Sequence, residues 1–360
     1  MNLNCFFCHS RSLYVRTLIC VAAASLCIDV ALSAHVHASV VSQGRQPQGT
    51  QVQGTQAATE VVGSPWVDEW LHGPILVGVL RGRQQPRETS ATALLHLLGF
   101  QGDRIDASVW TRDTGWTRQV LHPRDVVGMQ WLEYRCDAEI SCSQMIFQIN
   151  AAIMDSLQST MKSGDTGELW LFDVSYRDAN AGDRHDWKPV CRPDREGHSR
   201  GLFLTGRWRG DGARLSSGYT FACTSGVLAK CARNFGYRPW QKRTAADGAL
   251  VALQPLHAAC VRAARADYCG DGTSYTRDNT MIDMADTYGF NRHEPGSAYE
   301  LEASFGEHGA TRIWRTRWPI AGHTGNGKRE FSCPQTQSTP RSIPPAKRDT
   351  LITVRRQARR

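Results

Sequence analysis

Residues 249–272 read ALVALQPLHAACVRAARADYCGDG, and their apolar residues recur at helical spacing. The apolar positions are Leu253, Leu256, Cys260, Ala263 and Ala264. Arg262 and Arg265 lie off this stripe, and Gly270 is a residue type at which helices commonly end. The stretch therefore predicts an amphipathic helix that buries one face and turns its two arginines toward water.

Two shorter segments on either side also predict helices. TSGVLAKCARNFG, residues 224–236, offers Thr224 and Ser225 as N-terminal caps and Gly236 as a stop. TMIDMADTYG, residues 280–289, follows a capping Asp-Asn pair and also ends on glycine. The three segments together predict a helical region.

The residues before this region read mostly as strands. The expected strands are ILVGVLRG (75–82), RIDASVWT (104–111), DVVGMQWLEYRC (125–136), QMIFQIN (144–150), GELWLFDVSY (167–176), GLFLTGRW (201–208) and SSGYTFAC (216–223). These runs are short, rich in β-branched and aromatic residues, and several alternate apolar with polar residues, as antiparallel strands do. We expect one helix among them, at Ala151–Met161, and two closing strands, AYELEASF (298–305) and ATRIWRTRW (310–318).

The N-terminus has the three zones of a secretory signal peptide. The first 16 residues carry two arginines and no acid, and residues 17–32 are mostly apolar. A small-residue segment then ends at Ala38, which suits cleavage before Ser39. Asp29 interrupts the apolar run, and no later segment approaches the ~18 apolar residues of a membrane span. We therefore expect residues 1–38 to be removed on export to the periplasm or medium, leaving no transmembrane segment.

The chain has 12 cysteines, and four of them belong to this leader. The remaining eight are Cys136, Cys142, Cys191, Cys223, Cys231, Cys260, Cys269 and Cys333. An even number of cysteines in an oxidising compartment predicts disulfides, and the missing CxxC pairs speak against structural zinc. Cys136 and Cys142 are close enough in sequence for a local bridge. The expected fold class is α+β: an antiparallel β-rich N-terminal part, then a disulfide-stabilised helical segment and closing strands.

Composition divides the chain into five parts. These are a signal peptide (1–38), a low-complexity Gln/Gly/Thr linker (39–65), a β-rich region (66–185), a helical domain with closing strands (186–334) and a basic disordered tail (335–360). The net charge of +8 is concentrated at the end, because residues 312–360 carry 12 Lys/Arg against two acids. Lys347–Arg360 is a candidate to bind an anionic envelope surface, and the competing interpretation is a solvated tail. We expect no specific nucleic-acid site.

Two runs around the longest helix resemble a known bacterial family. FACTSGVLAKCARNFGYRPW (221–240) and LHAACVRAARADYCGDGTSYTRDNTMIDMADTYG (256–289) are similar to the ADYC domain, which is named after the string at residues 266–269. The resemblance covers roughly residues 186–320, and it implies an exported protein without implying a particular reaction. It leads us to expect a cysteine where this chain has Ala310-Thr311-Arg312-Ile313, so the pairing of Cys333 stays open.

The helix around the ADYC string offers a candidate thiol nucleophile. His257 and Cys260 lie three residues apart and share a helix face, so His257 is a candidate base for Cys260. The competing interpretation, which we favour, is structural. It pairs Cys260 with Cys231 on the neighbouring helix, and Cys223 with Cys269.

Acidic residues supply two further hypotheses. A calcium site would draw on Asp271, Asp278, Asp283 and Asp286, although their spacing does not match an EF-hand loop. A glycan hydrolase would pair Asp267 or Asp271 with Glu300 or Glu302, since such enzymes use two carboxyls. The competing interpretation of Asp271 is a tight glycine turn, and that of Asp278 is a helix cap.

The sequence thus favours an exported, disulfide-stabilised binding or structural module of the cell envelope or secreted milieu, with no cofactor. The alternative is a hydrolase of envelope glycan or peptide, whose catalytic candidates are His257, Asp267 and Asp271.

Overall fold

The computed structural model describes ten stretches of the chain. They are residues 75–79, 92–136, 142–155, 168–180, 187–194, 196–208, 214–276, 280–293, 299–317 and 350–357. All of them belong to one compact unit, Gln46–Arg360. Within these stretches, no helix has the length and apolar character needed to cross a membrane.

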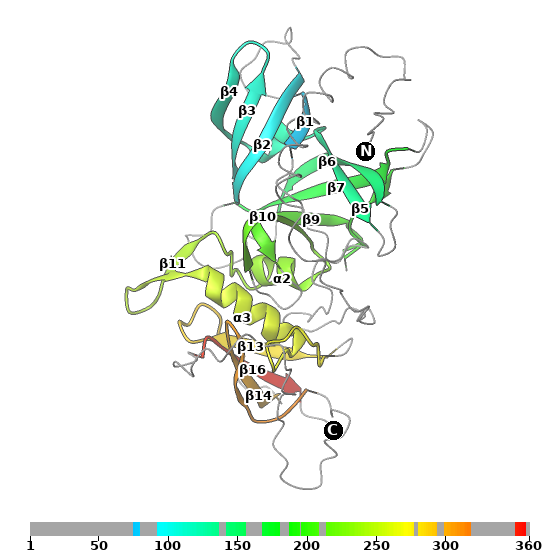
Figure 1. Cartoon of the computed structure of the whole chain (residues 1–360). Helices are drawn as coiled ribbons and strands as arrows, with labels where there is room; N and C mark the ends of the chain where they lie inside the picture. Colours follow the sequence, from blue (N-terminus) through cyan, green and yellow to red (C-terminus); the bar gives the residue numbers. More distant parts are fainter. Residues whose placement is uncertain are drawn as a thin grey trace, which may run out of the picture. The chain divides into compact units, whose positions relative to one another are not determined.

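Most strands join one large antiparallel sheet (Figure 1). Its members are β1 (Ile75–Val79), β2 (Thr92–Gln101), β3 (Arg104–Thr111), β4 (Gly115–Leu121), β5 (Gln130–Cys136), β6 (Cys142–Met154), β7 (Trp170–Asp178), β8 (Lys188–Pro189), β9 (Arg200–Trp208) and β10 (Arg214–Cys223). The order is β10-β9-β7-β6-β5-β1-β2-β3-β4, with β8 beside β7. A short 3-10 helix, Pro123–Val126, leads from β4 toward β5.

The inner face of this sheet holds an aromatic core. Along β3, Ile105, Ala107 and Val109 are fully buried, while the residues between them are not. The sheet curls so that β2 reaches β9, where the Phe100 amide donates to Thr205 Oγ1. Phe100 also stacks on Phe203 with 4.6 Å between ring centroids. Alternating apolar residues therefore line an enclosed core, as period-two strands require.

The other face of β9 is buried as well, by two helices. These are α2 (Val227–Arg233) and α3 (Leu253–Arg265), which follow β10 in sequence. Leu202 and Leu204 of β9 belong to the same buried cluster as Leu228 and Leu256 of the helices. Burial on both faces explains the nearly continuous apolar run of β9.

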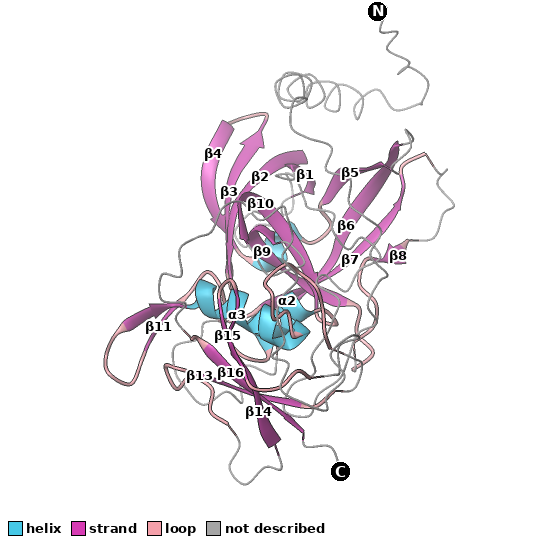
Figure 2. Cartoon of the chain, turned by 60° about the horizontal axis from the view of Figure 1, so that its bottom comes forward, coloured by secondary structure: helices cyan, strands magenta, loops and turns pink. Residues whose placement is uncertain are grey.

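A second, four-stranded sheet covers the opposite side of α3 (Figure 2). It consists of β13 (Ile282–Asp286), β14 (Tyr299–Gly306), β15 (Gly309–Ile313) and β16 (Ile352–Gln357), in the order β13-β16-β14-β15. A small hairpin, β11 (Lys242–Thr244) and β12 (Leu250–Ala252), precedes α3. The α+β fold with strands before the helices is confirmed.

The predicted helix at residues 280–289 is wrong. Ile282 and Met284 are buried on one side of β13, and the strand pairs along its length with β16. A backbone partner and a period-two burial pattern outweigh the local cap and stop signals. The strand ends at Asp286, whose carboxylate accepts backbone N–H groups from the following turn, including that of Asn291 at 2.6 Å.

The helix expected at Ala151–Met161 is also wrong where the structure describes it. Ala151–Met154 continue β6 and pair with β7. The rest of that segment lies outside the described residues, apart from Asp155. Pairing with a neighbouring strand again overrides a local helical preference.

The tail expected to be disordered contains an ordered strand. β16 lies between β13 and β14 and pairs antiparallel with both. Ile352 and Val354 have no exposed surface, because they pack into the cluster that holds α3. The basic residues of the tail obscured a short alternating apolar pattern, ITV, which the strand uses for burial.

Candidate functional site

The ADYC string begins where α3 ends. Ala266 adopts the left-handed conformation, with φ 54°, and is the one non-glycine residue with positive φ in the described part of the chain. The Asp267 amide donates back to the carbonyl of Arg262 at 2.9 Å, which closes the helix terminus. A buried alanine thus takes a role usually given to glycine, and the two residues after it, Asp267 and Tyr268, are buried in the interior.

Asp267 organises the turn that follows. Its side chain is fully buried, and its Oδ2 atom lies 2.7 Å from Arg262 Nη1. The carboxylate also accepts the backbone N–H groups of Gly270 and Gly272. Burial raises the pKa of Asp267 to about 6, while Arg262 and the Gly272 amide act to lower it. The carboxylate is therefore bound by an arginine of α3 and by two amides of the turn that follows the helix.

Gly270 shows how tightly this loop is held. Its φ is +70°, and an added Cβ atom would lie 2.0 Å from the carbonyl oxygen of His308. The Ala310 amide donates to the Tyr268 carbonyl across the same contact. The loop after α3 is therefore fixed against the β14–β15 hairpin.

Tyr268 extends the network to a buried ion pair. Its hydroxyl donates to Glu302 Oε1 at 3.0 Å and accepts the Arg317 amide at 2.6 Å. The Arg317 guanidinium pairs with Glu302 at 2.9 Å, and both side chains are completely buried. Burial, followed by the neighbouring Glu302 carboxylate, raises the pKa of Tyr268 well above its ordinary value.

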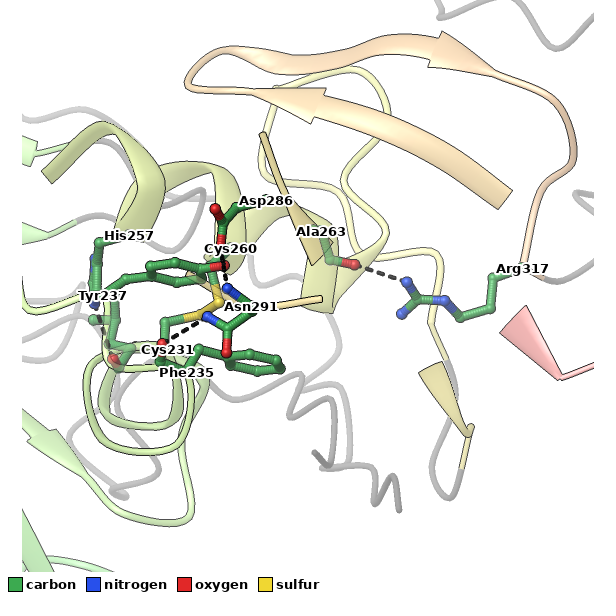
Figure 3. The surroundings of a disulfide bond; sticks show 10 residues. Cys231, Phe235, Tyr237, His257, Cys260, Ala263, Asp286, Asn291 and Arg317 are labelled. Atoms are coloured by element: carbon green, nitrogen blue, oxygen red, sulfur yellow. Dashed lines mark hydrogen bonds between the residues drawn. A yellow bond between two sulfur atoms is a disulfide. The ribbon is translucent and has the colours of Figure 1, made fainter. Parts of the chain in front are cut away.

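Arg317 also closes the C-terminus of α3. Its Nη2 atom donates to the carbonyl oxygen of Ala263 (Figure 3) and its Nη1 atom to that of Ala264, each at 2.7 Å. The last carbonyls of a helix lack intrahelical partners and carry partial negative charge, so a buried cation satisfies them well. Arg317 therefore ties three elements together: α3, β14 and the segment after β15.

The disulfides partly match the expected pairing. Cys231 of α2 is bonded to Cys260 of α3, as predicted (Figure 3). The predicted pairing of Cys223 with Cys269 is wrong, because Cys223 is bonded to Cys191. Cys269 is also disulfide-bonded.

The remaining cysteines are described in part. Cys136 and Cys142 lie opposite one another in the register of β5 and β6, and their side chains are outside the described residues. Cys333 lies outside them too. Arg312, found where the resemblance suggested a cysteine, places its guanidinium 4.8 Å from the Trp314 ring centre.

The thiol-nucleophile hypothesis is wrong in this structure, since the Cys260 sulfur is bonded to Cys231. His257 is fully buried, and its Nε2 atom lies 3.0 Å from the Leu228 carbonyl oxygen. Its ring meets Trp208 edge to face. Burial lowers the pKa of His257 to about 4, with the Leu228 hydrogen bond acting against it. His257 is therefore a neutral core residue.

We expect stability to fall in acid because of His257. Its pKa is 6.5 in an ordinary setting and about 4 in the fold, so the unfolded chain binds this proton more tightly. The stabilisation is complete above pH 6.5 and is lost as the pH falls toward about 4. Denaturant unfolding at neutral and at acid pH measures how much free energy of unfolding is lost in acid. This loss should be about 2–3 kcal/mol smaller in His257→Gln than in the wild type.

The matched control for this experiment is His308→Gln, since His308 is exposed. That variant should keep the wild-type dependence of stability on pH. An equally steep dependence in His257→Gln and the wild type would contradict the role assigned to His257.

The calcium candidates are not gathered by the fold. Asp271 is exposed, and its carboxylate accepts the Thr273 amide within a glycine turn, as the competing interpretation expected. Asp283 lies 2.9 Å from His293 Nδ1. Asp286 accepts the Tyr237 hydroxyl at 2.8 Å, and Asp278 lies outside the described residues. Among the described residues, none of these acids belongs to a group of three metal-ligating side chains.

Three of the four carboxyls of the hydrolase hypothesis are paired with arginine, and Asp271 is the exception. Asp267 pairs with Arg262 and Glu302 with Arg317. Glu300, which is more exposed, lies 2.9 Å from Arg315. A glycosidase needs its two carboxyls to face a cleft that admits sugar, and the complete burial of Asp267 and Glu302 does not favour this use.

One cluster of ligand-type residues was not expected from the sequence. Asp194, Glu196 and His198 place one ligand atom each within 4.8 Å of one another. Asp194 already accepts the Glu196 and His198 amides and the Thr224 hydroxyl. Glu196 also lies 3.5 Å from the cationic Arg233. The Asp194 carboxylate is therefore already used to hold the backbone of its own segment. Its bond with the Thr224 hydroxyl also explains why Thr224 does not cap α2.

The prediction that the two arginines of α3 face water is also wrong. Arg262 and Arg265 are 3% and 6% exposed, so they do not face water. Arg262 Nε donates to the Glu307 carbonyl oxygen, and Arg265 Nη2 donates to that of Gly272. Arg317 was not a candidate at all. No local signal separates such arginines from surface ones, because their partners come from distant parts of the chain.

Comparisons with known proteins place this arrangement in a family. A family model described as ADYC domain matches residues 123–319. The match begins well before residue 186, where the resemblance was expected to start, and so takes in β5, β6 and β7. No curated protein and no solved structure matches the chain.

Proposed function

This chain belongs to the ADYC domain family, and on that premise we propose that it is an exported, disulfide-stabilised binding or structural module in which the ADYC string is part of the scaffold. Its setting would be the cell envelope or the secreted milieu. Lys347–Arg360 would supply an attachment to anionic envelope surface, although Arg356 already lies 3.4 Å from Glu300.

The scaffold role is supported by one observation: each of the four residues of the ADYC string makes a structural contact or bond. Ala266 ends α3, Asp267 holds the following turn, and Tyr268 bonds the Arg317–Glu302 pair. Cys269 is in a disulfide. A catalytic group must reach its substrate, and buried groups that are saturated by internal partners cannot do so without opening the fold.

Export is supported by two independent features. The first is the tripartite N-terminus, which is typical of a cleaved leader. The second is the presence of disulfides, which persist in oxidising compartments and are rare in the cytosol.

Expression of the whole chain, leader included, in a bacterial host tests this proposal. We expect the protein in the periplasm or medium, with a mass that corresponds to loss of residues 1–38. Titration under denaturing, non-reducing conditions should find no free thiol at Cys191, Cys223, Cys231, Cys260 or Cys269. Retention in the cytosol at full mass with free thiols would overturn the proposal.

The control is a chain that lacks residues 2–38, which should stay in the cytosol. A parallel incubation of the exported protein with isolated envelope glycan tests the competing hydrolase. We expect no release of soluble fragments, and release that disappears in Asp267→Asn, with folding retained, would favour the enzyme.

A further inference from the structure

The outward face of β2, β3 and β4 brings two tryptophans together. Trp110 of β3 lies directly opposite Trp116 of β4 in the strand register. Both point away from the core, because the neighbouring Val109 is fully buried and side chains alternate along a strand. Directly opposite residues on one face are close enough to act as one surface. β2, β3 and β4 lie side by side in both views (Figures 1 and 2).

Part of this face is apolar and exposed, while Trp110 is half-buried and Leu94, which lies opposite it on β2, is buried. Trp116 and Val120, both on β4, are 53% and 60% exposed. Leu98 of β2, at the bulge between Leu97 and Gly99, is 41% exposed. Single exposed apolar residues are ordinary, whereas several on one face of a sheet favour a binding surface.

A polar row runs beside the tryptophans. His96, Ser108 and Arg118 lie opposite one another across β2, β3 and β4. Ser108 and Arg118 are each two residues along the strand from the tryptophan of that strand, on the same face of the sheet. The next step holds Asp106, which is paired at 3.3 Å with Arg104 and is thereby neutralised. Arg118 is exposed and has no carboxylate partner among the described residues, so the face carries an uncompensated positive charge.

We propose that this Trp110–Trp116 face, formed by His96, Leu98, Ser108, Trp110, Trp116, Arg118 and Val120, binds an acidic glycan chain. A pyranose ring presents an apolar C–H face that packs on an indole ring and a rim of hydroxyls that need hydrogen-bond partners. The two tryptophans would pack on the apolar face of the sugar, and Ser108 and His96 would form hydrogen bonds with its hydroxyls. Arg118 is complementary to a carboxylate carried by the polymer, because a guanidinium forms charge-assisted hydrogen bonds with it.

The pattern favours a glycan over a protein partner. Protein interfaces have an apolar centre with a polar rim around it. Here a polar row crosses all three strands directly beside the aromatic row, which suits a narrow polymer that lies along the sheet. The face lies before residues 123–319 and is therefore outside the part of the chain that the family model matches.

This inference rests on the proposed function, since envelope glycans are met only after export. Sedimentation of the exported full chain with insoluble particles tests it. The probes are peptidoglycan sacculi and chitin, which share β-linked N-acetylhexosamine rings, while only the sacculi carry carboxylates. We expect the wild type to sediment with both and to bind sacculi more tightly at low salt.

Two variants separate the two kinds of contact. Trp116→Ala should weaken binding to both polymers by about three- to tenfold, the size of a lost aromatic contact. Arg118→Gln should weaken binding to sacculi and leave binding to chitin unchanged. Both side chains are exposed, so each variant should keep the wild-type melting temperature.

Trp314→Ala is the matched control. Trp314 is also exposed, at 38%, but it follows β15 of the four-stranded sheet and is not part of the Trp110–Trp116 face. It should bind both polymers as the wild type does. The inference fails if the wild type binds neither polymer, if Trp116→Ala binds normally, or if Trp314→Ala loses as much affinity. An exported, oxidised chain that binds neither polymer overturns this face alone. A cytosolic chain with free thiols overturns the proposed function instead.

Discussion

Replacement of Arg317 by methionine is expected to lower the free energy of unfolding by about 3–5 kcal/mol. The variant leaves Glu302 charged and completely buried without its cation, which is far more costly than loss of an exposed pair. It also leaves the carbonyl oxygens of Ala263 and Ala264 without the donors that close α3. Urea unfolding of the oxidised protein at neutral pH measures the change.

Arg315→Met is the control for this prediction. Arg315 is two residues away and also pairs with a glutamate, but its side chain is 58% exposed. Its loss should cost less than about 1 kcal/mol, as is usual for surface pairs. The double variant Arg317→Met, Glu302→Gln should recover part of the stability, because the stranded charge is then removed. Similar losses in Arg315→Met and Arg317→Met would contradict the central role of the buried pair.

Deletion of residues 351–360 is expected to destabilise the protein by about 5 kcal/mol or more. Ile352 and Val354 have no exposed surface, and each fills a part of the core beneath α3. β13 has β16 as its partner in the described sheet, so it would lose its backbone hydrogen bonds as well. Unpaired backbone groups beside a buried helix add to the cost of the two side chains.

The shorter deletion of residues 358–360 is the matched control, because it leaves β16 intact. That variant should unfold at the wild-type urea concentration and resist limited proteolysis equally well. The longer deletion should be cleaved rapidly near β13 and β14. Equal resistance of both variants would show that β16 is dispensable, as expected for the disordered tail predicted from composition.

Much of the fold follows from short-range patterns. The segments around α2 and α3 carry apolar residues at helical spacing, and most expected strands alternate apolar with polar residues. The bond between Cys231 and Cys260 could be anticipated because two short neighbouring helices each present a cysteine on their apolar side. The roles of Asp267 and Tyr268 as scaffold residues could be anticipated only in outline, since their partners were not identified.

The sequence by itself determined where apolar periodicity and turn residues occur, and therefore the α+β class and the presence of α3, although the helix ends at Arg265 and not at the predicted stop, Gly270. The tertiary structure decided which ambiguous segments became strands: residues 282–286 and 352–357 fold as β13 and β16 because each supplies the other's hydrogen-bond partners. It also decided that Arg262, Arg265 and Arg317 are buried. A charged side chain can leave water only when its counter-charges and acceptors converge from distant segments, and that convergence is not encoded in any local window of sequence.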